Sequence, residues 1–153
     1  MGFWPLRLFV NQTCRRAQFL KVQGFAKAAG KRIIGVSYFE VLANSYVFEG
    51  NICVFTVFPA GKIGWQNFEC YEGIVEFSNE IQIENLGNFF QRQPQSELLT
   101  DIETFKKLDS NLIGKHLIRS VTEINLAGIL GQLAALKRAE DVFSNPNPLY
   151  FSF

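Results

Sequence analysis

The segment Ser120–Phe143, which reads SVTEINLAGILGQLAALKRAEDVF, is the stretch whose helical signals agree at its start, middle and end. Ser120 followed by Glu123 has the spacing of a capping box, in which each side chain accepts a hydrogen bond from the other residue's backbone N–H. Large apolar residues recur at helical spacing, basic residues occupy the last turns, and Ser144-Asn145-Pro146 supplies a stop signal. The sequence therefore predicts a long C-terminal helix around which the chain is organised.

This helix also carries a face of small residues, roughly opposite its stripe of leucines and isoleucines. Such a face packs well where another backbone approaches closely, and added bulk there would overpack the contact. We therefore expect a close helix contact at Gly128, Gly131 and Ala135, and these three residues are candidates for an interface.

Between Arg32 and Ile83 the apolar period changes to two, and turn residues interrupt the chain at short intervals. This pattern predicts an antiparallel meander. The expected strands are Arg32–Val41, Ser45–Phe48, Ile52–Phe58, Ile63–Tyr71 and Ile74–Phe77, with Ile81–Ile83 as a possible continuation. The expected turns are Glu49–Asn51, Ala60–Lys62 and Glu72–Gly73.

One of these strands, Ile52–Phe58, has apolar residues on both faces. Val54, Thr56 and Phe58 alternate with Cys53, Phe55 and Val57, so neither set is typical of a solvated face. A strand that is apolar on both sides is typical of a central strand buried on both sides. We therefore expect helices on both faces of it.

The remaining segments are shorter or less regular. Phe3–Val10 is expected to be an edge strand, and Thr13–Ala29 a helix with Gly30 at its C′ position. Beyond the meander we expect a short helix at Asn85–Arg92, a helix at Ser96–Leu108 with Thr100 or Asp101 near its start, and either a strand or the lead into the C-terminal helix at Leu112–Ile118. Together these elements predict a single α+β domain, residues 1–153, in which an antiparallel β-meander sheet packs against an N-terminal helix and a long C-terminal helix.

Length and cysteine content set limits on the class of protein. A chain of 153 residues with 48% hydrophobic residues suits one folded domain. The longest uncharged stretch of the C-terminal helix, Ile124–Leu136, is too short to span a bilayer, so no membrane span is expected. Cys14, Cys53 and Cys70 are odd in number and form no C-x-x-C pair, which indicates reduced thiols in the cytoplasm or, alternatively, an organelle interior.

Charge is distributed unevenly along the chain. The first 39 residues contain seven basic residues and no acidic residue, whereas all 14 acidic residues follow. The asymmetry is either satisfied within the fold or between subunits, or it marks a contact with nucleic acid or another anion, since aromatic residues interleave with the cations. The anion-binding candidates are Arg7, Arg15, Arg16, Lys21, Lys27, Lys31 and Arg32.

No pattern of catalytic residues stands out. The turns at Gly30-Lys31 and Gly61-Lys62 lack P-loop spacing, and for the single His116 we expect a surface or capping role. The acids Glu69, Glu72, Glu76, Glu80 and Glu84 are either one solvated sheet face or the ligands of a divalent metal. We expect no catalytic residue, no cofactor and no resident metal.

These features favour a non-catalytic interaction or assembly subunit of a larger homo- or hetero-oligomeric complex. A protein partner or self-association is expected, and an apolar tail, expected to be docked, adds the interface candidates Leu149, Tyr150, Phe151 and Phe153. The alternative is a nucleic-acid-binding or nucleic-acid-processing protein that uses the basic segment 7–32. An enzyme is the less favoured reading.

Overall fold

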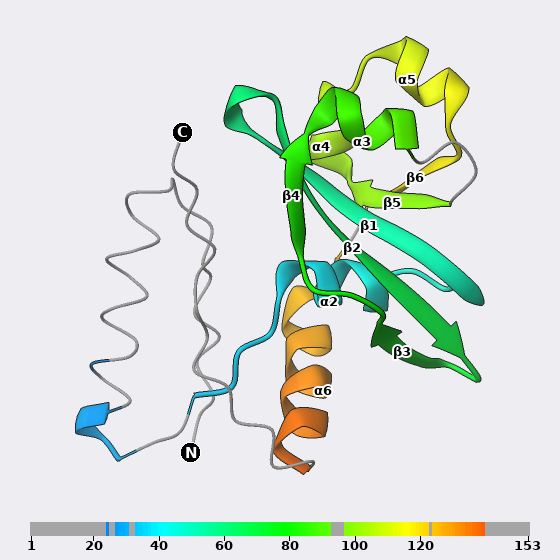
Figure 1. Ribbon diagram of the computed structural model, residues 1–153. Helices are drawn as coiled ribbons and strands as arrows, with labels where there is room; N and C mark the ends of the chain where they lie inside the picture. Colours follow the sequence, from blue (N-terminus) through cyan, green and yellow to red (C-terminus); the bar gives the residue numbers. More distant parts are fainter. Residues whose placement is uncertain (1–23, 25–26, 31–32, 93–96, 123, 140–153) are drawn as a thin grey trace. The chain divides into compact units, whose positions relative to one another are not determined.

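The computed structural model describes residues 24, 27–30, 33–92, 97–122 and 124–139 (Figure 1). The chain divides into two compact units, Ser37–Ile129 and the pair Met1–Val36 with Leu130–Phe153. Among the described residues, no helix combines the length and the apolar character needed to cross a bilayer. The helices are α2 (Tyr38–Asn44), α3 (Leu86–Arg92), α4 (Ile102–Lys107), α5 (Ser110–Lys115) and α6 (Leu126–Ala139), with a 3₁₀ turn η1 (Pro59–Gly61); the strands are β1 (Gly50–Phe58), β2 (Lys62–Tyr71), β3 (Ile74–Phe77), β4 (Gln82–Asn85), β5 (Leu98–Asp101) and β6 (Ile118–Val121).

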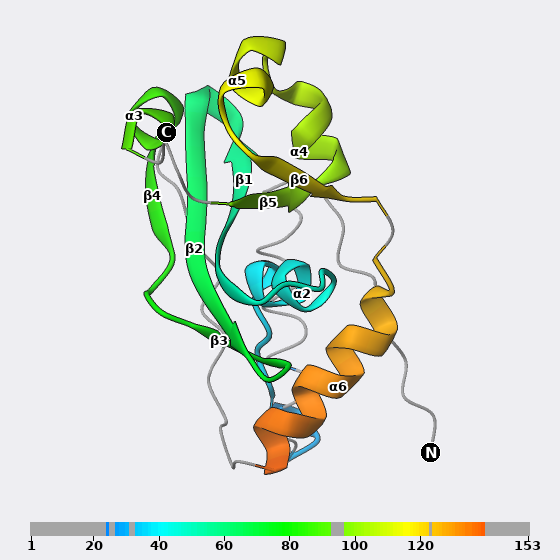
Figure 2. The ribbon, with the colours of Figure 1, turned by 90° about the vertical axis from the view of Figure 1, so that its right-hand side faces the viewer.

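The unit Ser37–Ile129 is built on a six-stranded mixed sheet. Five of its strands follow the order β3-β2-β1-β5-β6, and the sixth, β4, also pairs with β2. Strands β1 and β2 form a long antiparallel hairpin, from the pair Gly50 and Cys70 to the pair Phe58 and Lys62. Strand β2 carries β3 and β4 along its other side, both antiparallel (Figure 2). On the far side of β1, strands β5 and β6 pair in parallel. The predicted antiparallel meander is therefore wrong for the sheet as a whole and right only for the β1–β2–β3 part.

The sequence did not predict the parallel strands β5 and β6, because each has only four residues and lies next to a helix in the chain. Strand β5 has four residues, all buried, so it shows no alternation. The predicted helix Ser96–Leu108 is in fact β5 followed by α4, which starts after Asp101. The carboxylate of Asp101 accepts from the Thr104 backbone N–H at 2.7 Å, which confirms the expected helix start at this residue. Likewise, Leu112–Ile118 contains the end of α5 and the first residue of β6.

Strand β1 is buried on both faces, as its sequence predicted. Ile52 and Val54 pack in one cluster with Phe39 and Leu42 of α2. The alternate residue Phe55 packs in a second cluster, in which α3 supplies two phenylalanines and β5 supplies Leu98. In the described part of the chain, α2 and α3 thus bury apolar residues against opposite faces of β1. The predicted N-terminal helix lies mostly outside the described residues.

Helix α2 occupies a segment that alternation had assigned to the strand Arg32–Val41, so that prediction is wrong. Its start is a capping box. The Ser37 N–H donates to Glu40 Oε2 at 2.7 Å, and the Glu40 N–H donates to Ser37 Oγ at 3.0 Å. The side chains of Phe39, Leu42 and Ala43 then face the sheet.

The capping box predicted at Ser120 is absent, because Ser120 belongs to β6. Helix α6 begins at Leu126, and Asn125 Oδ1 accepts from the Gly128 N–H at 3.1 Å, as an N-cap residue does. Near its other end, Lys137 Nζ donates to the Gly35 carbonyl oxygen at 2.9 Å. The helix is therefore real, but its N-cap residue, Asn125, lies five residues beyond the predicted one.

Two of the three expected turns are confirmed. Glu72 (φ 53°) and Gly73 (φ 78°) join β2 to β3, and Ala60 (φ 60°) and Gly61 (φ 65°) join β1 to β2. The hairpin expected around Glu49–Asn51 is absent because Ser45–Phe48 forms no strand. Gly30, the expected C′ residue, has φ 62°, and its N–H donates to the Lys27 carbonyl oxygen at 3.2 Å.

Burial of β1 also governs the chemistry of Cys53, whose side chain is almost inaccessible. Desolvation and, to a smaller extent, the nearby negative charge of Glu84 raise the pKa of the Cys53 thiol from 9.0 to about 12. The thiolate is the reactive form of cysteine, so Cys53 is inert in the folded protein.

Replacement of Ser37 by alanine removes one half of the α2 capping box. We expect Ser37→Ala to lower the free energy of unfolding by about 1 kcal/mol, measured by urea denaturation. The matched control is Ser120→Ala, which removes the same hydroxyl from a residue of β6 and should cost less. Equal losses in the two variants would contradict the assignment of the cap.

Thiol labelling tests the burial of β1. In a Cys14→Ser, Cys70→Ser background, Cys53 should react with a disulfide reagent at pH 8 about a thousandfold more slowly in the folded protein than in urea. The reason is that a pKa of about 12, in place of 9.0, leaves far less of the reactive thiolate. A folded-state rate within tenfold of the rate in urea would show that β1 is accessible on that face.

Candidate functional site

A groove of about 320 Å³ lies between α3 and α5, a size typical of small-ligand sites. Its wall is mainly apolar, and three polar side chains stand on it. The lining residues are Leu86, Gly87, Phe90, Gln91, Leu112, Lys115 and His116.

The floor of the groove is fixed from below by aromatic packing. The Phe90 ring lies edge-on to Phe89 at 5.0 Å and to Phe55 of β1 at 5.8 Å between ring centroids. Phe89 in turn lies 5.6 Å from Phe55 and 5.9 Å from Trp65 of β2. Because these rings are close-packed against the buried strand, the floor is preorganised rather than formed by a ligand.

His116 closes the other wall. It is the C-cap residue of α5, and its backbone N–H donates to the Leu112 carbonyl oxygen at 3.2 Å. Its half-buried ring lies 5.1 Å from the Phe90 ring, tilted by 50°. The expected capping role of His116 is confirmed, but its position in a groove was not foreseen from the sequence.

The other two polar groups come from opposite walls. Lys115 is exposed in the last turn of α5, and Gln91 is exposed near the end of α3. The groove thus combines an apolar floor with an ammonium, an imidazole and an amide. This set can hold an anionic group while an apolar body lies on Phe90 and Leu112.

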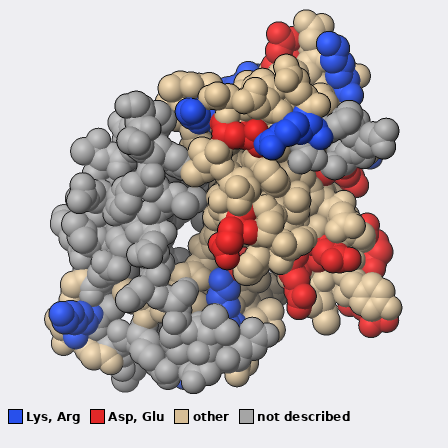
Figure 3. Space-filling view, viewed as in Figure 1, with Lys and Arg blue, Asp and Glu red and all other residues tan. Residues whose placement is uncertain are grey.

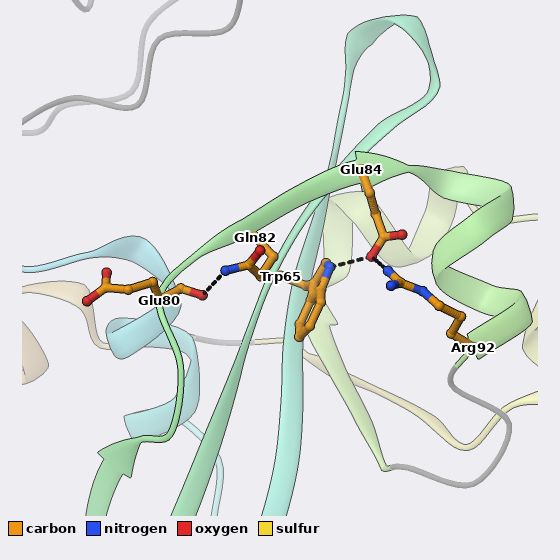
Figure 4. Close-up of polar contacts among 5 residues, drawn as sticks. All are labelled: Trp65, Glu80, Gln82, Glu84 and Arg92. Atoms are coloured by element: carbon orange, nitrogen blue, oxygen red, sulfur yellow. Dashed lines mark hydrogen bonds and ion pairs between the residues drawn. The ribbon is translucent and has the colours of Figure 1, made fainter.

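Glu84 of β4 anchors the helix that carries half of the groove. Its Oε1 accepts from Trp65 Nε1 at 2.7 Å and also pairs with Arg92 in the last turn of α3 (Figure 4). The Glu84 side chain is 16% exposed, so it is largely shielded from water, whereas Arg92 lies at the surface. Glu84 is therefore a structural carboxylate that joins β2, β4 and α3.

The other four glutamates considered with Glu84 lie on the surface, as expected for solvated side chains. Glu69, Glu72, Glu76 and Glu80 are exposed, and in the part of the chain that the structure describes no group of three possible metal ligands comes together. Figure 4 shows the Glu80 carboxylate pointing away from Glu84, while the Glu80 carbonyl oxygen accepts from Gln82 Nε2 at 3.2 Å.

A buried polar chain lies at the carboxyl ends of the parallel strands β1 and β5. Thr104 Oγ1 is 3.1 Å from Asp101 Oδ2 and 3.1 Å from Thr56 Oγ1. Since an ionised carboxylate only accepts, Thr104 donates to Asp101 and accepts from Thr56. Thr100 Oγ1 donates to the Phe55 carbonyl oxygen at 2.7 Å. These groups satisfy one another, so they lock α4 to the sheet rather than face a substrate.

The predicted interface residues of α6 lie on an open face. Gly128, Gly131 and Ala135 are exposed, and a Cβ placed on Gly131 would meet no atom within 4 Å. The described residues thus show no close helix contact at Gly131, and such a contact at these three residues stays a prediction. Of the seven basic candidates only Lys27, which is exposed, is among the described residues, and the tail candidates Leu149, Tyr150, Phe151 and Phe153 lie outside them.

Comparison with known proteins identifies a fold but no family. No protein-family model matches the chain, and no curated protein matches it significantly. Two solved structures from Pseudomonas aeruginosa match at 15% identity. YeaZ matches with a TM-score of 0.66 over 95% of this chain and 71% of its own. An uncharacterized protein with similarity to the peptidase YeaZ matches with a TM-score of 0.65 over 92% of this chain and 68% of its own.

These matches correct both the fold and the function expected from the sequence. The fold is a mixed α/β fold that resembles YeaZ, not an antiparallel meander. The expectation of a non-catalytic assembly subunit of an oligomer is contradicted as well. The chain shares its fold with YeaZ, which the description of one match calls a peptidase, and a peptidase is an enzyme. The nucleic-acid alternative stays a prediction, because its basic segment lies mostly outside the described residues.

Proposed function

We propose that the groove between α3 and α5 binds a small anionic ligand with an aromatic or apolar body, and that the protein acts on this ligand in an enzyme-like way. The observation that carries the proposal is the lining of the groove, which includes Gln91, Lys115 and His116 together with the apolar Phe90 and Leu112. An apolar pocket with a few convergent polar groups is the usual form of a ligand site.

Each polar group has a distinct role in this proposal. The Lys115 ammonium attracts the anion and donates a charge-assisted hydrogen bond to it. Histidine is the side chain best suited to exchange protons near neutral pH, so His116 is our candidate general acid or base. The amide of Gln91, which can both donate and accept, orients the polar end of the ligand. The fold shared with YeaZ supports an enzyme-like role, and the peptidase named for one match makes acyl compounds the first class to test.

We also propose that the protein acts in a reducing compartment, the cytoplasm. Cys53 and Cys70 are free thiols buried in β1 and β2, which supports this assignment.

The ligand class can be tested with N-acetylphenylalanine and its neutral amide, which differ only in the charge of one end. The acid should bind more tightly and should shift the backbone amide resonances of Gln91, Lys115 and His116 in NMR titrations. Lys115→Ala should weaken binding of the acid about five- to tenfold and leave binding of the amide unchanged.

The control is Lys107→Ala, which removes an exposed lysine from α4 outside the groove. It should leave both affinities unchanged. Equal binding of the acid and the amide, or shifts confined to residues outside α3 and α5, would refute the proposed ligand class.

A further inference from the structure

The outer face of the β2–β3 hairpin exposes large apolar side chains beside several carboxylates. Tyr71 and Ile74 are cross-strand partners and are 70% and 64% exposed. The next partners on the same face are Glu69 and Glu76, two like charges directly opposite each other. Such a pair destabilises a hairpin unless a cation joins it.

Two more carboxylates extend this surface at the hairpin end. Glu72 occupies the turn, and its backbone N–H donates to Glu49 Oε1 at 3.3 Å. Among the residues that the structure describes, no basic side chain forms an ion pair with Glu49, Glu69, Glu72 or Glu76. Figure 3 shows acidic side chains gathered over this end of the sheet, with no Lys or Arg among them there.

Among the strands that the structure describes, β3 of this hairpin lies at one edge of the sheet. Strand β3 pairs with β2 on one side, and within the described part of the chain no strand pairs with its other side. Its last residue, Phe77, is 53% exposed. An edge strand with exposed apolar side chains offers backbone N–H and C=O groups to an added strand.

The turn residue Glu72 adds a conformational argument. Its φ of 53° lies in the left-handed region, and with Gly73 it forms the kind of two-residue turn in which Asn-Gly is the favoured sequence. Glutamate is therefore less favourable than asparagine for the backbone conformation of residue 72.

We propose that this acidic edge, defined as Glu69, Tyr71, Glu72, Ile74, Glu76 and Phe77, binds a basic, extended segment of a partner protein. The segment lies alongside β3 as an added strand. Its Lys or Arg side chains pair with the carboxylates on the outer face, and its alternate apolar side chains lie on the other face, beside Phe77. The negative charge of the acidic edge favours a basic partner. The backbone N–H and C=O groups on the outer side of β3 favour a partner segment in an extended conformation.

The test uses the full chain and three synthetic peptides. Acetyl-KIRVKIRV-amide alternates basic and apolar residues, acetyl-EIDVEIDV-amide reverses its charge, and a variant of the first peptide with two central prolines cannot pair as a strand. In calorimetric titrations at low salt, the first peptide should bind, and raising the salt to about 0.5 M should weaken it. The acidic and proline peptides should not bind.

Matched variants locate the site. Glu69→Gln with Glu76→Gln should weaken the basic peptide about tenfold, whereas Glu103→Gln, which removes an exposed acid from α4, should not change its affinity. Equal loss with Glu103→Gln, binding of the acidic peptide, or no binding by the full chain would overturn the proposal. Dimerisation of the chain alone that is lost in the double variant would also overturn it, because a second copy would then occupy the edge.

Glu72→Asn separates folding from binding at the same position. Because asparagine tolerates the left-handed conformation, the variant should melt about 2–4 °C higher than the wild type. It should also bind the basic peptide about two- to fivefold more weakly, since it removes one carboxylate. A variant that is more stable and binds equally well would show that Glu72 takes no part in the edge.

Discussion

The burial of β1 on both faces is the constraint on which the rest of the structure depends. Ile52 and Val54 face α2, whereas Phe55 faces α3, and each buried side chain of this kind contributes about 1.5–3 kcal/mol. A strand so placed must have a strand on each side and a helix layer on each face. The second layer brings Phe89 and Phe90 onto Phe55, and the floor of the groove follows from that contact.

Much of the sheet could be predicted where a strand is long and flanked by turn residues. Alternation located β2 and β3, and the two apolar faces of Ile52–Phe58 identified the central strand correctly. The parallel strands could not be found this way, because a four-residue strand buried on both faces has no periodicity. The pattern Ser-x-x-Glu occurs at both Ser37 and Ser120, and only tertiary packing decides that the first caps a helix and the second lies in a strand.

The candidate site was less predictable than the fold. Lys115 and His116 are adjacent in the sequence, and their positions near a turn were visible. Their partner Phe90 is 26 residues away in the sequence and reaches them only because β1 and β4 place α3 next to α5. Conversely, Glu84 looked like one of five equivalent surface acids, but a short strand turns it toward Trp65 and makes it structural.

The most direct test of this account is a set of side-chain nuclear Overhauser effects in the folded protein. A two-sided β1 predicts contacts from the Val54 methyl groups to Phe39 and Leu42, together with contacts from the Phe55 ring to the Phe89 and Phe90 rings. Nuclear Overhauser effects on only one face of β1 would mean that a single helix layer covers the strand. In that case neither the mixed sheet nor the groove above Phe90 could exist as described.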